Sequence, residues 1–330
     1  MRIQPDMATW QGRVDEAEGE LGRRWHQVVK PLADESDGIA FVGFACDAGV
    51  ARNHGRTGAG DGPAAIRAML SNMPMRGRMR LFDAGDVRCH PTACGDDGLE
   101  QAQEALASTL DSLLDRGLFP LVLGGGHEMA YGSFGGLARH LARRHAEDGT
   151  PAPRIGIINL DAHFDLRMAD RASSGTPFRQ IAQDCAARAW PFNYCCLGVS
   201  EFANTEALFA RARSLGAVWR RDVDMGAPHF AQTLEQLAAF MAGVDHVYLT
   251  LCLDVLPASV APGVSAPAAR GVALELVESI VDAVARSGKL RIADIAEMNP
   301  AFDIDAHTAR VAARLAARVV AEVAAEPGSP

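Results

Sequence analysis

The sequence lacks the long apolar segments that mark membrane or secreted proteins. No uninterrupted apolar run approaches the roughly 20 residues that span a bilayer, and Met1–Asp6 contains no apolar core of a secretory signal. The seven cysteines are irregularly spaced, include the adjacent pair Cys195-Cys196, and form neither a CxxC metal motif nor a regular disulfide framework. We therefore expect no membrane span, no disulfide framework and a reducing cytoplasmic location.

Charge and glycine patterns exclude further classes of protein. The chain has 41 acidic and 32 basic residues, and this formal net charge of −9 argues against nucleic acid or an anionic membrane as a partner. The glycine-rich loop at 53–63 has neither the Gly-x-Gly-x-x-Gly spacing nor the Gly-Lys-Ser/Thr ending of a phosphate-binding loop. We therefore predict no nucleotide site there.

Short apolar segments alternate with helical patterns along the chain. Strands are expected at 38–44, 118–123, 155–160, 195–199, 217–219, 247–253 and 290–295, and helices at 11–32, 64–70, 99–116, 131–144, 230–242, 274–286 and 307–325. This alternation predicts an α/β fold with a mostly parallel central sheet covered by helices on both faces. Without a repeat, linker or composition break, residues 1–330 are expected to form one domain. Its first 35 or so residues should form a helical N-terminal segment, and residues 326–330 a frayed tail.

The stretch Asn159–Arg167 carries the clearest chemical pattern. It places Asp161, His163 and Asp165 at alternate positions after an apolar strand, so an extended backbone would point all three the same way. Two carboxylates and an imidazole at the end of a buried strand are costly to desolvate unless a cation joins them, and a divalent metal is the natural candidate. A helix cap with an incidental histidine is the alternative.

Two other predicted strands end in the same way. His127 follows three glycines after the strand at 118–123, and Cys252 and Asp254 share a face at the end of the strand at 247–253. Alone, His127 also fits a capping or packed histidine, and Asp254 also fits a strand-end cap. Parallel strands present ligands at their carboxyl ends. Taken with the central stretch, these residues therefore predict one shared metal site.

These three segments together resemble the metal-binding signatures of the ureohydrolase family, which includes arginase, agmatinase and formimidoylglutamase. The resemblance extends from about Asn53 to Glu297-Met298-Asn299-Pro300. Similar proteins fold as a single three-layer α/β/α domain, bind two manganese ions and commonly form homo-oligomers. By this resemblance the metal ligands would be His127, Asp161, His163, Asp165, Cys252 and Asp254.

The resemblance also implies a reaction. Two metal ions that share one water would lower its pKa from about 15.7 toward 7, and the hydroxide would attack an amidine-type carbon. Glu297 would be the carboxylate that stabilises the cationic nitrogen end of the substrate, although a surface glutamate is the alternative for this residue.

Cys252 departs from the family pattern, which usually has a bridging aspartate at this position. A thiolate there would favour zinc over manganese, and adjacent metal ions would lower the thiol pKa enough to form it. A protonated thiol would weaken the second metal site. A packed core cysteine beside a single metal ion is the remaining alternative.

Arg167 narrows the choice of substrate within the family. It stands where arginases and agmatinases typically carry asparagine, and Asp-Ala-His-Phe-Asp-Leu-Arg resembles the formimidoylglutamase branch. Arginine suits the carboxylates of a dicarboxylate amidine, although a solvated or structurally paired arginine is the alternative. Ser174 is expected to donate a hydrogen bond to the substrate. Asn53 and Arg56 are candidates for a second carboxylate contact or for a role in shaping their loop.

We therefore expect hydrolysis of N-formimidoyl-L-glutamate to L-glutamate and formamide, a late step of histidine breakdown. Phe178 falls where arginase has a proton-shuttle histidine, so proton transfer must use another group or bulk water. One alternative is another ureohydrolase, acting on a guanidino acid or an agmatine-type substrate. The other, suggested by Cys252, is a catalytically weak single-metal homologue with a binding or regulatory role.

Overall fold

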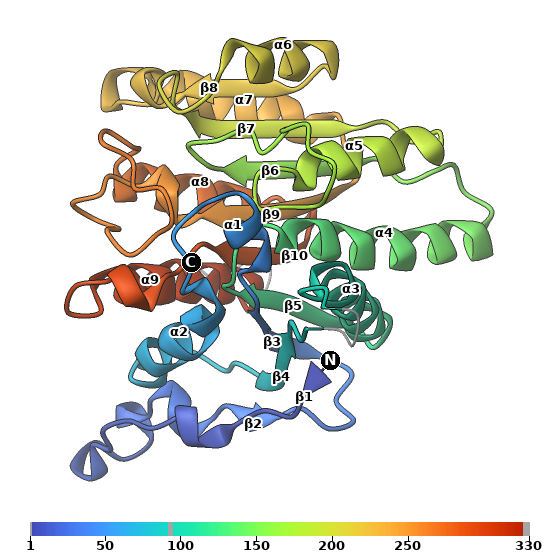
Figure 1. Cartoon of the computed structure of the whole chain (residues 1–330). Coiled ribbons are helices and arrows are strands. Elements are labelled where there is room, and N and C mark those ends of the chain that lie inside the picture. Colours follow the sequence, from blue (N-terminus) through green and yellow to red (C-terminus); the bar gives the residue numbers. More distant parts are fainter. Residues whose placement is uncertain (1, 92–94, 326–330) are drawn as a thin grey trace.

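A mostly parallel sheet runs through the whole chain (Figure 1). The computed structural model describes residues 2–91 and 95–325, so the tail predicted at 326–330 lies outside it. In this part of the chain, ten strands form one sheet: β1 Arg2–Ile3, β2 Lys30–Pro31, β3 Gly38–Ala45, β4 Leu81–Arg88, β5 Leu118–Leu123, β6 Ile155–Leu160, β7 Asn193–Val199, β8 Val218–Arg221, β9 His246–Cys252 and β10 Leu290–Ala296. The order is β1-β4-β3-β5-β10-β9-β6-β7-β8, with β2 also paired to β4, and only β1 is antiparallel to its neighbour among these strands.

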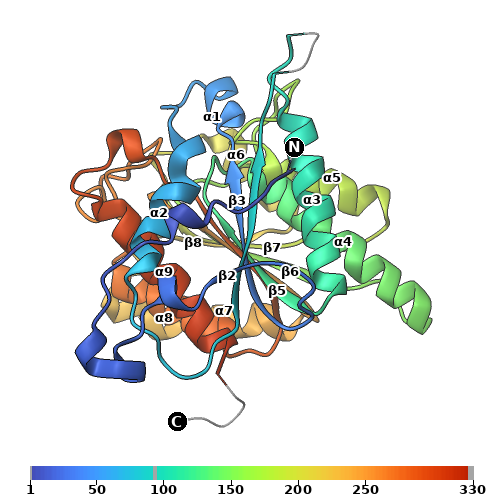
Figure 2. The same cartoon turned by 90° about the horizontal axis from the view of Figure 1, so that it is seen from below.

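Helices cover both faces of the sheet, which confirms the three-layer α/β/α prediction. They are α1 Ala48–Arg52, α2 Gly62–Ser71, α3 Leu99–Asp115, α4 Met129–Asp148, α5 Pro177–Ala187, α6 Glu206–Ser214, α7 Phe230–Ala242, α8 Leu274–Ala285 and α9 His307–Val323. Figure 2 shows α2, α8 and α9 on one side of the sheet and α3, α4 and α5 on the other. Across the described residues, no helix combines the length and apolar character needed to cross a membrane.

The central strands are buried on both faces, which explains why they read as continuous apolar runs. Every residue of β6 is buried, as are six of the seven residues in β9. Two hydrophobic clusters, one on each side of the sheet, contain their alternating side chains. All strands predicted from the sequence therefore appear, each within two residues of its expected bounds at either end.

The predicted helix at 11–32 is wrong. The structure has short 3-10 turns at Met7–Thr9, Glu16–Gly22 and Trp25–Gln27 instead. Gly19 adopts φ 57° and ψ −138°, which no right-handed helix tolerates. The segment also packs inward, because the ring of Trp25 lies 5.8 Å from that of Phe41 and is almost fully buried. The N-terminal segment is thus an irregular chain that packs against the core, and not an exposed amphipathic helix.

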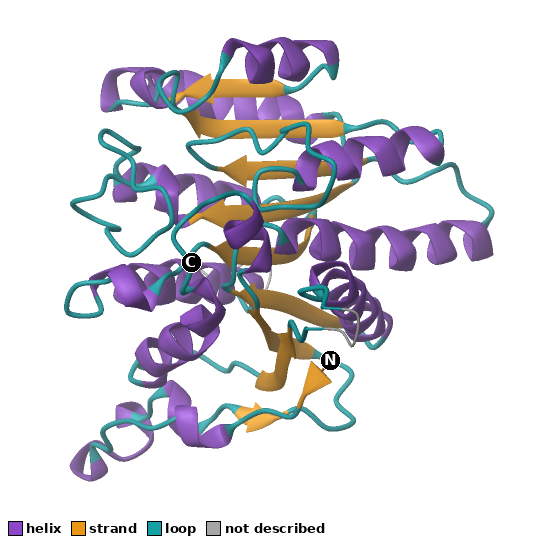
Figure 3. Cartoon of the chain, viewed as in Figure 1, coloured by secondary structure: helices purple, strands orange, loops and turns teal. Residues whose placement is uncertain are grey.

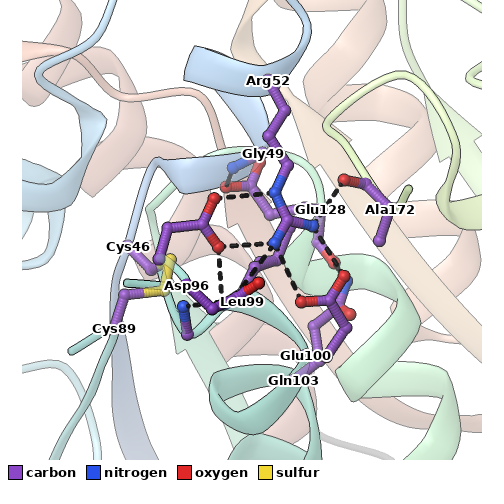
Figure 4. The surroundings of a disulfide bond; sticks show 12 residues. Cys46, Gly49, Arg52, Cys89, Asp96, Leu99, Glu100, Gln103, Glu128 and Ala172 are labelled. Carbon is purple, nitrogen blue, oxygen red and sulfur yellow. Dashed lines mark hydrogen bonds and ion pairs between the residues drawn. A yellow bond between two sulfur atoms is a disulfide. The ribbon is translucent and has the colours of Figure 1, made fainter. Parts of the chain in front are cut away.

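The structure also contains a disulfide bond that the sequence did not predict. Cys46 and Cys89 are joined by a disulfide with a Cα–Cα distance of 5.2 Å (Figure 4). The register of β3 and β4 pairs Ala45 with Arg88, so the residues that follow them come side by side. This neighbourhood arises from strand pairing across 43 residues, and cysteine spacing alone does not reveal it.

Candidate metal centre and substrate pocket

A cavity of about 300 Å³ lies at the carboxyl edge of the sheet and collects nearly all the predicted site residues. Figure 3 shows the arrowheads of β6–β9 pointing to this edge. The predicted residues that line the cavity are Asn53, Arg56, His127, His163, Asp165, Arg167, Ser174, Cys252, Asp254 and Glu297. Asp161, fully buried, lies directly behind this lining, against the side chain of His127. The predicted site residues are spread from position 53 to position 297 of the sequence, and the fold brings them to one site.

His127 anchors the first group of candidate ligands. Its Nδ1 lies 3.0 Å from a carboxylate oxygen of Asp161 and 3.0 Å from one of Asp165. These approaches lack hydrogen-bond alignment, and Nδ1 has no hydrogen-bond partner in the described chain. The opposite nitrogen, Nε2, lies 2.9 Å from the hydroxyl oxygen of Thr250. Burial opposes the charged form, but the contacts with Asp161 and Asp165 hold the pKa of His127 well above its usual range.

His163 forms a second group that shares Asp161 with the first. Its Nδ1 lies 3.1 Å from a carboxylate oxygen of Asp254 and 3.5 Å from one of Asp161. The backbone N–H of His163 donates to Asp161 Oδ1 at 2.7 Å, which fixes that carboxylate between the two histidines. Asp161 thus has one oxygen facing each group. The arrangement resembles two neighbouring cation sites with a common carboxylate.

The stretch from Asp161 to Asp165 is a loop and not the extended chain that the alternating pattern assumed. Asp165 has φ 48°, in the left-handed region that only a minority of non-glycine residues adopt. This turn brings its carboxylate back towards His127, whereas His163 turns towards Asp254. The predicted convergence is therefore achieved by backbone bending.

Cys252 belongs to the first group. Its sulfur lies within 4.8 Å of ligand atoms of both His127 and Asp161, and the side chain lines the cavity. Burial, followed by the nearby carboxylate of Asp161, raises the pKa of the Cys252 thiol well above its usual range. Without a cation beside it, this residue is a neutral thiol.

The donor set fits divalent cations. The ring nitrogen Nδ1 of His127 is buried and lies 3.0 Å from each of two carboxylate oxygens. In the neutral Nε2–H tautomer, with Thr250 as the acceptor, Nδ1 carries a lone pair, and a cation stabilises these three electron-rich atoms. Nitrogen and carboxylate ligands with one sulfur suit manganese or zinc. The residues present therefore match a metal centre with two positions.

Glu297 is a buried glutamate beside the candidate metal ligand His127. Glu297 follows β10 with φ 70°, and its Oε1 accepts a hydrogen bond from the backbone N–H of His127 at 2.9 Å. Its Oε2 is buried and has no partner within residues 2–91 and 95–325. Burial, and then the nearby Glu128, raises the pKa of Glu297 to about 8. The surface alternative for Glu297 does not hold, because only 4% of the residue is exposed.

Arg167, Asn53 and Ser174 lie together in the pocket. Asn53 donates to the Ser174 hydroxyl at 3.1 Å, and the backbone N–H of Arg167 donates to the carbonyl of Gly175 at 2.8 Å. A Cβ at Gly175 would come within 2.8 Å of the Arg167 side chain and 3.2 Å of Asn53. The Arg167 guanidinium makes no ion pair within the described chain and is exposed to the cavity. It is available to an anionic ligand.

Arg56 serves mainly to structure its loop. Its guanidinium donates to the carbonyl oxygens of Val264 and Ser265 and stacks on the ring of Phe302 at 4.1 Å. These contacts engage its Nε and Nη2 and fix the guanidinium against the loop at 264–265. The sequence allowed both roles, and the contacts favour the structural one.

Phe178 is fully buried, stacked on Tyr194 and edge-on to His127. It can pack against the metal centre but cannot carry a proton. The residues that the sequence did not single out include Thr250, which holds His127, and Asn204, whose amide accepts from the Phe164 N–H and donates to the Ala162 carbonyl. Thr250 lies two residues before Cys252 on β9, on the same face of the strand, so the strand pattern could have identified it. Asn204 lies in a loop, where no such pattern exists.

Comparison with known proteins agrees with this geometry. A model of the arginase family matches residues 37–321. The chain is 63% identical over 316 residues to a formimidoylglutamase of Ralstonia nicotianae, covering 95% of this chain and 94% of that one. It is 53% identical to a formimidoylglutamase of Aeromonas hydrophila, covering 93% and 95%. Among solved structures, Trypanosoma cruzi formiminoglutamase with Mn²⁺₂ matches with a TM-score of 0.77 and 25% identity, covering 92% and 99%.

Proposed function

The chain belongs to the arginase family, and from that premise we propose that it hydrolyses N-formimidoyl-L-glutamate to L-glutamate and formamide. The C–N bond between the formimino carbon and the glutamate nitrogen breaks, and the oxygen of water becomes the formamide oxygen. One observation carries the proposal. Two candidate ligand groups that share Asp161 face the same cavity as the unpaired guanidinium of Arg167. The high identity to formimidoylglutamases supports it.

The protein would hold a binuclear metal centre, most simply two Mn²⁺ ions. One position would be held by His127, Asp161, Asp165 and Cys252, and the other by Asp161, His163 and Asp254, as their distances suggest. When bound, the ions supply a water molecule acidified enough to attack the formimino carbon. The Mn²⁺ carried by the Trypanosoma cruzi relative supports manganese for this chain.

Glu297 would stabilise the substrate's cationic nitrogen end as a carboxylate, because bound metal ions and the cationic nitrogen lower the pKa of about 8 that it has in the metal-free protein. Its Oε1 is held by the backbone N–H of His127, and its Oε2 is left for a ligand. Because His127 is also a candidate metal ligand, this hydrogen bond ties the carboxylate to the metal centre. A carboxylate fixed beside the reacting carbon stabilises positive charge as it develops on the amidine.

Arg167 would bind a substrate carboxylate, and Asn53 and Ser174 would complete the contact. A guanidinium forms paired hydrogen bonds to carboxylates, and the same charge repels the cationic tail of agmatine. Phe178 carries no proton, so the leaving amine takes its proton from solvent in the pocket. We further propose that the protein acts in the cytoplasm and that it assembles as a homo-oligomer like its family.

A substrate panel tests the proposal. Purified protein loaded with Mn²⁺ should release formamide and glutamate from N-formimidoyl-L-glutamate and no urea from arginine or guanidino acids. Urea release would contradict it. A catalytically weak single-metal homologue is favoured by Cys252 alone, and this alternative predicts one ion per chain and negligible turnover with every metal tried.

A further inference from the structure

Arg52, the last residue of α1, lies almost buried at the centre of a polar junction (Figure 4). Its Nε and Nη2 donate to the two oxygens of Asp97 at 2.8 and 2.5 Å. Its Nη1 and Nη2 donate to the two oxygens of Glu100 at 2.7 and 2.9 Å. Nη1 also donates to the backbone carbonyl of Ala172 at 2.9 Å. The guanidinium therefore joins three chain segments that are far apart in the sequence.

The third of these segments carries part of the substrate pocket. Ala172 and Ser174 are separated by one residue, in the irregular connection between β6 and α5. Ser174 in turn accepts a hydrogen bond from Asn53, the residue directly after Arg52. Arg52 and Asn53 thus hold this connection at two adjacent points. The connection continues to Gly175, whose carbonyl accepts from the backbone N–H of Arg167.

The two carboxylates that accept hydrogen bonds from Arg52 are held in place by the start of α3. Glu100 lies in the first turn of α3, and Asp97 accepts a hydrogen bond from the backbone N–H of Leu99 at 3.2 Å. Arg52 therefore couples the substrate connection to the start of α3.

We propose that Arg52 is a positioning residue for substrate recognition, which fixes Ser174 and Asn53, and through Gly175 the backbone of Arg167, around the substrate carboxylates. The inference rests on the proposed function, in which those three residues bind the substrate. Donors held in place before binding raise affinity, because the ligand does not have to order them. Arg52 itself has no free donor for a ligand, since its donors are spent on Asp97, Glu100 and Ala172.

Arg171 provides a matched control. Its guanidinium approaches the same acidic side chains, at 2.5 Å from Asp96, 3.8 Å from Asp97 and 3.8 Å from Glu100. It is half exposed, and among the described contacts only Arg52 reaches the Ala172 carbonyl. Arg171 also lies on the substrate connection, but its ion pairs are exposed to solvent and such pairs contribute little. Replacing it removes the same charge from the same acidic neighbourhood and leaves the bond from Arg52 to the Ala172 carbonyl intact.

The test compares Arg52→Gln, Arg52→Lys and Arg171→Gln in the metal-loaded, full-length protein. Arg52→Gln should raise KM by at least about tenfold, with kcat and the number of bound metal ions close to those of the wild type. Arg52→Lys should also raise KM, because one ammonium group cannot replace a planar guanidinium that donates to Asp97, Glu100 and the Ala172 carbonyl at once. Arg171→Gln should leave KM unchanged.

Amide hydrogen exchange gives a second readout that needs no turnover. Backbone amides of 167–176 should exchange faster in Arg52→Gln than in both the wild type and Arg171→Gln. An unchanged KM and exchange in folded Arg52→Gln, or an equal rise of KM in Arg171→Gln, would overturn the proposal. If Arg52→Gln does not fold, Glu100→Gln is measured in its place against the same expectations. A wild type that does not turn over N-formimidoyl-L-glutamate contradicts the proposed function instead, and the exchange arm then tests Arg52 alone.

Discussion

The imidazole Nδ1 of His127 lies 3.0 Å from a carboxylate oxygen of Asp161, and both side chains are almost completely shielded from solvent. This pair places a basic nitrogen and an acidic oxygen where a proton or a metal ion can sit, but not both. The competition between the two governs how the site responds to pH and to metal.

Metal binding should release protons. In the metal-free protein, despite burial, contacts with carboxylates hold the pKa of His127 and of His163 well above the usual range. Ligation requires neutral imidazoles, so metal affinity should increase as pH rises. Calorimetric titration with Mn²⁺ in two buffers of different ionisation enthalpy measures the protons released. Identical heats in both buffers would contradict the prediction.

The stability of the metal-free protein should decrease as pH rises, whereas its metal affinity increases. A histidine whose folded pKa is raised contributes stability that is fully present below its unfolded pKa of about 6.5 and is lost as pH rises through the folded value. His127 and His163 should therefore make the metal-free protein less resistant to urea as pH rises above about 6.5. Urea midpoints across this range, with and without Mn²⁺, test the sign. Metal-loaded protein should not show the decline.

Cys252→Asp should tighten metal binding at the position that contains His127. An aspartate would add a negative charge beside His127 and Asp161 without the protonation cost of the buried thiol. We expect its Mn²⁺ dissociation constant to fall on the order of tenfold, or about 1.4 kcal/mol. Metal titration followed by electron paramagnetic resonance of free Mn²⁺ measures it. Cys195→Ala, a buried cysteine that does not line the cavity, is the control and should not change it.

Thr250→Val should weaken the metal position that contains His127. The hydroxyl of Thr250 lies 2.9 Å from His127 Nε2 and orients the ring. Loss of such a supporting hydrogen bond costs about 10–100-fold in metal affinity. Thr250→Ser keeps the hydroxyl and should remain near the wild type. A loss in Thr250→Ser as large as that in Thr250→Val would contradict the prediction, because serine keeps the hydroxyl.

Arg167→Met should impair substrate binding and leave the metal centre intact. A hydrogen bond to a charged group is worth about 1.5–3 kcal/mol, so kcat/KM for N-formimidoyl-L-glutamate should fall by roughly 10–150-fold. Steady-state kinetics and metal content measure the two effects separately. Arg213→Met, an exposed residue of α6 that is paired with Glu206, should behave as the wild type.

Reduction of the disulfide should lower stability without emptying the metal centre. Closing a loop of 43 residues constrains the unfolded chain by up to about 4 kcal/mol, whereas β3 and β4 remain paired by their backbone hydrogen bonds. Urea midpoints with and without a phosphine reductant measure the difference. A Cys46→Ser/Cys89→Ser double variant should be insensitive to the reductant. Loss of bound metal on reduction would contradict the prediction.

The sequence predicted those strands whose residues are buried on both faces, because such strands are continuously apolar. It did not reveal β4, because Asp83, Gly85 and Asp86 interrupt its apolar pattern. These acids are neutralised by Arg67 from α2, which donates to Asp83 at 2.7 Å and to Asp86 at 2.7 Å. A polar residue inside a strand can be recognised as buried only when its distant partner is known.

The candidate site was predictable to the extent that its residues follow strands. Cys252 ends β9, Asp254 follows it by two residues, and His127 follows β5 by four. The parallel sheet brings these strand ends together. The turn at Asp165 and the role of Arg52 depend on loops, where the conformation is set by distant hydrogen bonds. Such contacts have no periodic signature in the sequence.

The strand order also constrains when the site can form during synthesis. β10 is the last of the described strands along the chain, yet it lies between β5 and β9, in the middle of the sheet. Until residues 290–296 have left the ribosome, β5 with His127 cannot come into register with β9 and Asp254. A nascent or C-terminally truncated chain therefore has two half-sheets with exposed edges, and the active centre can close only after nearly the whole polypeptide has been made.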